Sequence, residues 1–206
     1  MLIFCAALVF AQNGVIKELT GTVELKQPGQ TAYITAKSGD TVVKDTIVST
    51  GFKSSALISI GSTVLTVRPL TRLSLAEISA AAGTETLNVT LQTGRVRVDV
   101  NPPVGTRAAM NVTSPMATAS VRGTSFEFDT QSLTVLEGTV TYQGNQGGVM
   151  MVSAGTASEV KENGSVADPV ETYVAELQPP PLAGSDSGYR HTVAMMGEFI
   201  IEFNLK

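Results

Sequence analysis

Three arginines are the residues of this chain best suited to hold an anionic group. Arg95 and Arg97 stand two positions apart in an alternating segment, so in an extended strand they share one side, while Val96 and Val98 face the other. Arg122 lies in a separate Arg-Gly-Thr segment. A guanidinium group binds carboxylate and phosphate oxygens through paired hydrogen bonds. Arg95, Arg97 and Arg122 are therefore the candidate binding residues, and a solvated strand face is the alternative for the first two.

Arg122 also has a structural interpretation. Between two alternating segments, Gly123 permits a bend and the hydroxyl of Thr124 closes a local turn, which leaves Arg122 to pair with an acid or with neighbouring carbonyl groups. The functional alternative is a mildly basic face, because six arginines outnumber three acids in the middle of the chain: Arg68, Arg72, Arg95, Arg97, Arg107 and Arg122 against Glu77, Glu85 and Asp99.

The sequence contains no recognisable catalytic or metal-binding pattern. Its single histidine, His191, is too close in sequence to Asp186, Ser187 and Gly188 to be held by a separate buried acid, as a serine-protease triad requires. The sequence also lacks a glycine-rich phosphate loop and the ligand spacings of zinc and calcium sites. We therefore predict that the protein is not an enzyme and has no catalytic residues, cofactor or metal site.

The charge distribution argues against nucleic acid as a partner. The chain has 206 residues and a net charge of −4, but residues 12–162 hold twelve basic and twelve acidic side chains, and residues 163–206 hold two and six. The first of these segments is neutral and the second is acidic, so neither has the basic patch that nucleic-acid binding requires. The composition, with 43% hydrophobic and 16% charged residues, is typical of a folded domain.

The first eleven residues form an uninterrupted apolar run that ends in Val9-x-Ala11, as in a secretory signal peptide. The run lacks basic residues at its start, and an apolar first strand is the alternative. It is too short to span a bilayer, which takes about 20 apolar residues, and no later segment is apolar enough. Cleavage would remove Cys5, the only cysteine, and leave a mature chain without disulfides or a transmembrane segment.

Alternating apolar and polar residues dominate positions 15–160 and predict many short β-strands separated by glycine turns. A leucine precedes a glycine at the start of three of them, at Gly21, Gly94 and Gly138, as expected where a strand bends sharply or two backbones approach closely. Their unequal spacing excludes a regular array. We predict an all-β fold, either a β-sandwich or an irregular β-solenoid. Residues 75–82 are the helical candidate, with a polar excursion between strands as the alternative.

The last part of the chain differs in composition from the alternating part. Residues 178–181 include three prolines and predict an extended linker, and residues 199–205 predict a strand that docks on an edge of the β domain or pairs with a partner. We therefore divide the chain into a signal peptide (1–11), a β domain (12–162) and an acidic, proline-rich linker and tail (163–206).

Residues 112–128 read VTSPMATASVRGTSFEF, and together with residues 50–69 and 135–140 they resemble the FecR-like domain, a family of bacterial all-β envelope domains. The resemblance extends over about residues 14–160 and is specific for the fold rather than for a biochemical activity. We assign structural roles to the turn residues of these segments and of the leucine-glycine pattern, namely Gly51, Gly61, Gly94, Arg122, Gly123, Thr124 and Gly138.

The best-known members of this family join the domain to a transmembrane helix and to a cytoplasmic segment that controls a sigma factor, and they receive a signal from an outer-membrane transporter. This sequence shows neither segment, so we predict an exported, non-enzymatic binding or scaffold module, periplasmic or secreted. Its expected partner is an envelope protein or an envelope glycan such as peptidoglycan. The alternative is the periplasmic part of a signalling regulator whose true start lies upstream of Met1.

Overall fold

The structure is a computed structural model that describes residues 13–81 and 83–171. Within these residues all regular secondary structure is β-strand, and there is no helix. Eighteen strands form two nine-stranded sheets, named here sheet I and sheet II. The predicted all-β class is confirmed, and the architecture fits the predicted β-sandwich. The predicted signal peptide, the proline-rich linker and the predicted terminal strand lie outside the described residues.

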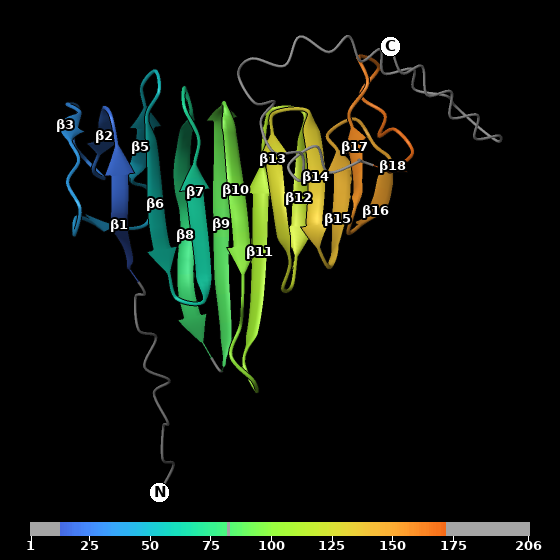
Figure 1. Cartoon of the computed structure of the whole chain (residues 1–206), viewed down its shortest axis with the longest axis horizontal. Helices are drawn as coiled ribbons and strands as arrows, with labels where there is room; N and C mark the ends of the chain where they lie inside the picture. The colour runs from blue at the N-terminus through green and yellow to red at the C-terminus, as the bar shows by residue number, and fades with distance from the viewer. Residues whose placement is uncertain (1–12, 82, 172–206) are drawn as a thin grey trace, which may run out of the picture. The chain divides into compact units, whose positions relative to one another are not determined.

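Both sheets follow the order of the chain closely, and Figure 1 shows this order as a gradient from blue to orange. Sheet I contains, from edge to edge, β18 (Val170–Glu171), β17 (Thr156–Glu159), β14 (Ser132–Glu137), β13 (Ser125–Asp129), β10 (Arg95–Val100), β7 (Thr63–Val67), β6 (Ser55–Ile60), β1 (Gly14–Thr20) and β4 (Thr41–Val42). Sheet II contains β16 (Val149–Ser153), β15 (Thr139–Gly144), β12 (Ala117–Val121), β11 (Arg107–Thr113), β9 (Thr84–Thr93), β8 (Arg72–Ala81), β5 (Ile47–Thr50), β2 (Val23–Lys26) and β3 (Ile34–Thr35).

The chain produces this order by adding hairpins to the two sheets in turn. The β6–β7 hairpin lies in sheet I, β8–β9 in sheet II, β13–β14 in sheet I and β15–β16 in sheet II. The chain therefore crosses repeatedly from one sheet to the other as it advances, which gives the sandwich a solenoid-like path. Strands β9 and β11 pair in parallel, because β10 lies in sheet I between them in sequence.

The core lies between the two sheets and is built from alternate side chains of their strands. In β10 the three valines are buried while Arg95 and Arg97 face outward, as the alternation predicted. Phe126, Phe128 and Tyr142 are fully buried, and the rings of Phe128 and Tyr142 meet edge to face with their centroids 6.0 Å apart. Each large apolar side chain buried in this way contributes roughly 1.5–3 kcal/mol to the stability of the folded protein. This packing fixes which side chains of each strand face solvent.

The helical candidate is wrong, and so is its alternative, because residues 75–81 belong to strand β8. Strand β8 pairs with β9, and the register shifts between Leu75 and Glu77. This bulge inserts one extra residue, so Leu75 and Ile78 both face the core although they stand three positions apart. The spacing imitated a helical period and the alanines favoured a helix, but pairing with β9 overrides both signals.

Strand pairing continues beyond residue 162. Strand β18 pairs with β17, and an isolated bridge joins Val160 and Val166. The division of the chain at residue 162 stays a prediction. Residues 13–81 and 83–171 contain no helix long and apolar enough to cross a membrane.

Candidate functional site

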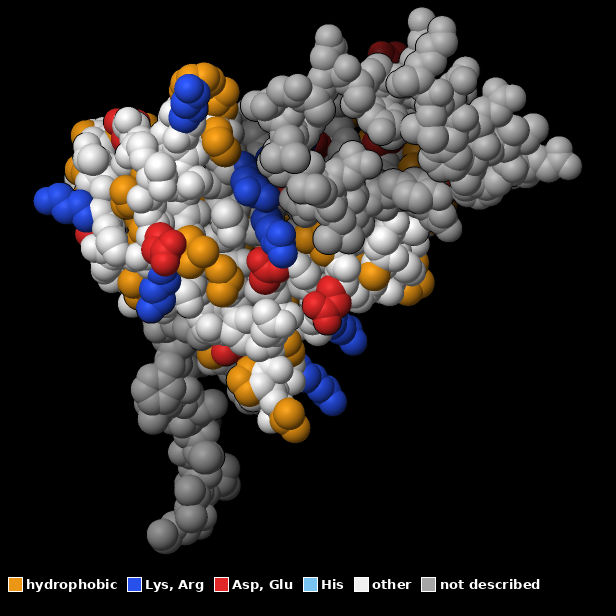
Figure 2. Space-filling view, viewed as in Figure 1, with side chains coloured by type: hydrophobic (Ala, Val, Ile, Leu, Met, Phe, Trp, Pro, Cys, Tyr) orange, Lys and Arg blue, Asp and Glu red, His pale blue; other side chains and the backbone are white. Residues whose placement is uncertain are grey.

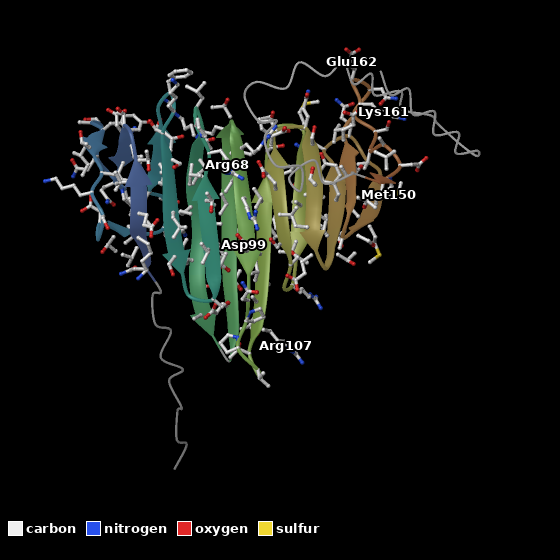
Figure 3. The ribbon with its side chains drawn as sticks, viewed as in Figure 1. Arg68, Asp99, Arg107, Met150, Lys161 and Glu162 are labelled. Atoms are coloured by element: carbon white, nitrogen blue, oxygen red, sulfur yellow. The ribbon has the colours of Figure 1, made fainter. Side chains whose placement is uncertain are left out.

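The outward face of sheet I carries a row of ion pairs on and next to strands β7, β10 and β13. This charged ladder consists of Arg68, Arg95, Arg97, Asp99, Glu127 and Asp129. Arg97 stands opposite Glu127 in the β10–β13 pair and opposite Thr66 in the β10–β7 pair, so alternation turns all of these side chains to the same side. Figure 2 shows basic and acidic side chains together on this face, and Figure 3 labels Arg68 and Asp99 there.

Glu127 is the centre of the charged ladder. Its Oε2 accepts a hydrogen bond from Nη2 of Arg68 at 3.2 Å, and its Oε1 lies 3.5 Å from Nη1 of Arg95. Arg95 also reaches Oδ2 of Asp129 at 3.4 Å. One carboxylate is therefore shared by two arginines, one next to β7 and one on β10.

Arg97 pairs within its own strand. Its Nε lies 3.2 Å from Oδ2 of Asp99, and Asp99 also accepts a hydrogen bond from the hydroxyl of Ser125. Arg95 and Arg97, both predicted as binding residues, thus have acidic partners, and the three arginines of the ladder balance its three acids. An anion binding here would compete with these carboxylates. The binding role of Arg95 and Arg97 stays a prediction.

The outward face of sheet II has a different chemistry. Strands β8, β9, β11, β12 and β15 place Glu77, Asn88, Asn111, Ser120 and Thr141 in one row across the sheet. Nδ2 of Asn111 donates to Oδ1 of Asn88 at 2.8 Å, and Nδ2 of Asn88 donates to Oε2 of Glu77 at 2.6 Å. This face therefore presents amides and hydroxyls, whereas sheet I presents ion pairs.

The three glycines of the leucine-glycine pattern lie where the chain crosses between the sheets, and each packs against a hydroxyl residue of another crossing. The pairs are Gly21 with Ser54, Gly94 with Thr71, and Gly138 with Thr124. The glycines have φ values of +71°, +86° and +79°, and a Cβ atom on them would lie 2.4 Å from Ser54 Oγ, 2.3 Å from Thr71 Oγ1 and 2.7 Å from Thr124 Cγ2. The close approach expected from the sequence is present at all three.

In the first two of these pairs, the residue after the glycine donates a backbone hydrogen bond to the partner hydroxyl, and in the third pair it does not. The N–H of Thr22 donates to Ser54 Oγ at 2.8 Å, and the N–H of Arg95 donates to Thr71 Oγ1 at 2.9 Å. In the third pair the methyl group of Thr124 faces Gly138, and its buried hydroxyl has no hydrogen-bond partner within the described residues. An unpaired buried hydroxyl is costly, so this crossing differs in kind from the other two.

A cleft of about 380 Å³ lies at this third crossing. We name it the crossover cleft, and its walls come from the end of β10, the β12–β13 turn and the end of β14: Val100, Asn101, Pro102, Arg122, Gly123, Thr124 and Glu137. The N–H of Val100 donates to the carbonyl oxygen of Thr124 at 3.0 Å and joins two of these walls.

Gly123 has a φ of +134°, and a Cβ atom there would lie 3.7 Å from Cδ of Pro102, which is an ordinary contact. The position therefore has room for a side chain but a backbone conformation that side chains disfavour. Arg122 and Glu137 are both exposed at the cleft, and within the described residues neither forms an ion pair or a side-chain hydrogen bond. The structure thus leaves Arg122 outside the ion pairs of the charged ladder, in which Arg95 and Arg97 take part.

Residues 45–141 match the family described as FecR protein. This chain carries a FecR-like domain. The match begins just before β5 and ends within β15, so the FecR-like domain includes the charged ladder, the crossover cleft and the glycines at positions 94 and 138. The turn glycines of the upstream segment also belong to it: Gly61 has a φ of +54°, and the N–H of Gly51 donates to the carbonyl oxygen of Thr22 at 2.9 Å.

Two crystal structures of a candidate anti-sigma factor from Parabacteroides distasonis are similar to this chain. They share 16% sequence identity with it and have TM-scores of 0.49 and 0.48. Each alignment covers 61% of this chain and 59% of the other, so the similarity extends over about three fifths of that protein. No curated protein matches the chain.

The buried Tyr142, just after the matched residues, has a structural role. The Tyr142 hydroxyl donates to the carbonyl oxygen of Gln131, and burial, with smaller contributions from the charges of Asp129 and Glu159, raises the pKa of Tyr142 well above its ordinary value. A phenol held neutral in this way is suited to a hydrogen bond and unsuited to act as a base at neutral pH. The described residues contain no cluster of three or more histidine, cysteine or acidic side chains that could hold a metal ion.

Sequence reasoning missed Glu127, Asp129 and Glu137. The alternation of Phe126 to Asp129 already placed the two acids on the outward side, but their pairing with β10 depends on sheet order. Glu137 follows a register shift in the β13–β14 pair, and no local pattern relates it to Arg122. The pairing of Glu127 and Asp129 with β10 and the shared cleft of Glu137 and Arg122 are non-local, and the sequence carried no signal for them.

Proposed function

We propose that this protein is a non-enzymatic binding module of the bacterial cell envelope, with an envelope protein as its partner. The observation that carries this proposal is the FecR match over residues 45–141, which includes the charged ladder and the crossover cleft. The ion pairs of the ladder and the amide and hydroxyl row of sheet II are surface chemistries suited to recognition rather than to catalysis. An envelope glycan such as peptidoglycan is the other ligand class, and the row of sheet II favours it.

A second candidate function is the periplasmic part of a regulator that controls a sigma factor. The FecR match supports this candidate, because the best-known domains of this family act in such regulators. In this case the binding module receives a signal from an outer-membrane transporter. The genomic sequence upstream of Met1 separates the two candidates: an open reading frame that encodes a helical domain and an apolar span favours the regulator.

Capture experiments on the full chain test the binding function. We expect the tagged protein to retain a discrete envelope protein after crosslinking, and we expect Arg97→Glu on sheet I or Asn111→Lys on sheet II to abolish this capture. Arg107→Glu is the matched control for charge reversal, because Arg107 is exposed at the start of β11 and labelled away from the ladder in Figure 3. Co-sedimentation with purified peptidoglycan, without a protein partner, would favour the glycan instead, and failure of both assays would contradict the proposal.

Export is part of the same proposal and rests on the apolar run at residues 1–11. Mass spectrometry of the native protein from an envelope fraction is expected to find an amino terminus at or near Gln12. Recovery of an intact Met1 from cytoplasmic material would contradict export.

A further inference from the structure

The crossover cleft brings together a buried hydroxyl without a hydrogen-bond partner and two charged side chains without an ion pair in the described part of the chain. Its Thr124 hydroxyl is buried without a partner, whereas the equivalent hydroxyls of Ser54 and Thr71 each accept a backbone N–H. Its two charged side chains, Arg122 and Glu137, are unpaired within the described residues, whereas the ladder arginines each have a carboxylate. A buried hydroxyl and two charges of opposite sign, all without partners in the described residues, therefore line the same cleft.

The signs of the two charges limit what fits the cleft. A polyanion would be attracted by the guanidinium of Arg122 but repelled by the carboxylate of Glu137. A polycation would be attracted by Glu137 but repelled by Arg122. A ligand with one anionic and one cationic group satisfies both side chains at once. The volume of about 380 Å³ lies at the small end of the range for ligand sites and suits a molecule of one to three amino-acid residues.

We propose that the crossover cleft binds a small zwitterion of the amino-acid or short-peptide class, with its carboxylate on Arg122 and its ammonium group on Glu137. Arg122 offers the paired N–H donors that a carboxylate accepts. Gly123 has no side chain, so the wall beside Arg122 is bare at this position. A Cβ atom there would lie 3.7 Å from the nearest atom, Cδ of Pro102. Asn101 adds an exposed carboxamide at the rim for the peptide group.

Calorimetric titration of the full chain with the dipeptide Ala-Ala tests the assignment. We expect saturable binding of Ala-Ala and binding at least about tenfold weaker for N-acetyl-Ala-Ala, which lacks the ammonium group, and for Ala-Ala amide, which lacks the carboxylate. Titrations with L-alanine and Ala-Ala-Ala compare a free amino acid with longer peptide ends and identify the ligand size that the cleft prefers.

Two variants, each of which replaces one charged side chain with a neutral one, assign the roles of Arg122 and Glu137. In Arg122→Gln the affinity for Ala-Ala is expected to fall at least about tenfold and the preference over Ala-Ala amide to disappear. In Glu137→Gln the preference over N-acetyl-Ala-Ala is expected to disappear. Both side chains are exposed, so both variants are expected to fold, and Arg107→Gln is the control that keeps wild-type affinity.

Absence of saturable Ala-Ala binding would overturn the proposal, and so would equal affinity of wild type and Arg122→Gln. The result is independent of partner capture, because the dipeptide needs only the cleft and not the outward faces of the sheets. Failure here would therefore leave the envelope-binding function standing, and success would add a small-molecule site to it.

Discussion

Gly138 and Thr124 are in such close contact that a Cβ atom on Gly138 would lie 2.7 Å from Cγ2 of Thr124. The two residues belong to different crossings between the sheets, and they meet because hairpin β13–β14 returns the chain to the point where it left sheet II. The same relationship recurs at Gly94 with Thr71 and at Gly21 with Ser54. Three pairs of crossings are thus packed together in the same way, with a glycine of one crossing against a hydroxyl residue of the other.

Gly94→Ala is expected to destabilise the protein strongly, by about 3 kcal/mol, because the new Cβ atom would lie 2.5 Å from the Cα atom of Thr71 in addition to the strain of a φ of +86°. Gly29→Ala is the matched control, since Gly29 has a φ of +73° and no heavy atom within 4 Å of a Cβ. It is expected to cost about 1 kcal/mol from conformation alone. Urea unfolding measures the free energy of unfolding of both variants. Equal losses of stability in the two variants would contradict the role of close packing at Gly94.

Thr71→Val and Thr124→Val are expected to have different effects. Valine keeps the shape of threonine but not the hydroxyl, so Thr71→Val leaves the partly buried N–H of Arg95 without its acceptor and is expected to cost about 1–3 kcal/mol. Thr124→Val removes a hydroxyl that has no partner in the described part of the chain and is expected to be neutral or slightly stabilising. Similar losses in thermal unfolding of the two variants would show that Thr124 is hydrogen-bonded after all.

Gly123→Val is expected to lower the free energy of unfolding by about 2 kcal/mol, because a φ of +134° is disfavoured by all side chains and most by β-branched ones. Since a Cβ atom here would make only an ordinary contact with Pro102, Gly123→Ala should lose nearly as much stability, which separates backbone strain from crowding. Denaturant unfolding of both variants gives the two values. Wild-type stability of the valine variant would show that the backbone here adapts at little cost.

Tyr142 is expected to make stability fall in alkaline solution. Its pKa is raised in the folded protein, so folding favours the protonated phenol. That contribution is complete below the unfolded pKa of about 10 and is lost as the pH rises above it, because only the unfolded chain releases the proton. Each pH unit in this range removes up to about 1.4 kcal/mol.

Tyr142→Phe isolates this effect, since other titrating groups are common to both proteins. At pH 7 the variant is expected to be less stable by about 1 kcal/mol, owing to the lost hydrogen bond to the Gln131 carbonyl. Urea unfolding from pH 9 to about pH 11 is expected to show the two stabilities converging. A constant difference across this range would contradict the raised pKa.

Local patterns determined the strands and the direction in which their side chains point. In β10 and β13 the alternation alone placed the valines and phenylalanines inward and the charged residues outward, because successive side chains of a strand face opposite sides. The pattern failed at Leu75 and Ile78, where a bulge changed the spacing from two to three and made a strand resemble a helix.

The sequence alone thus determined an all-β chain with a FecR-like signature, three glycines at sharp bends or close backbone approaches, and arginines on outward faces, since alternation, turns and backbone freedom are local properties. Only the tertiary structure decided which arginines are neutralised. Arg95 lies beside Glu127 and Asp129 because β10 and β13 are neighbours in sheet I, although 32 and 34 positions separate these residues from Arg95. Arg122 shares a cleft with Glu137 because two crossings converge. Such pairings depend on sheet order, and sheet order is set by packing of the whole core rather than by any short segment.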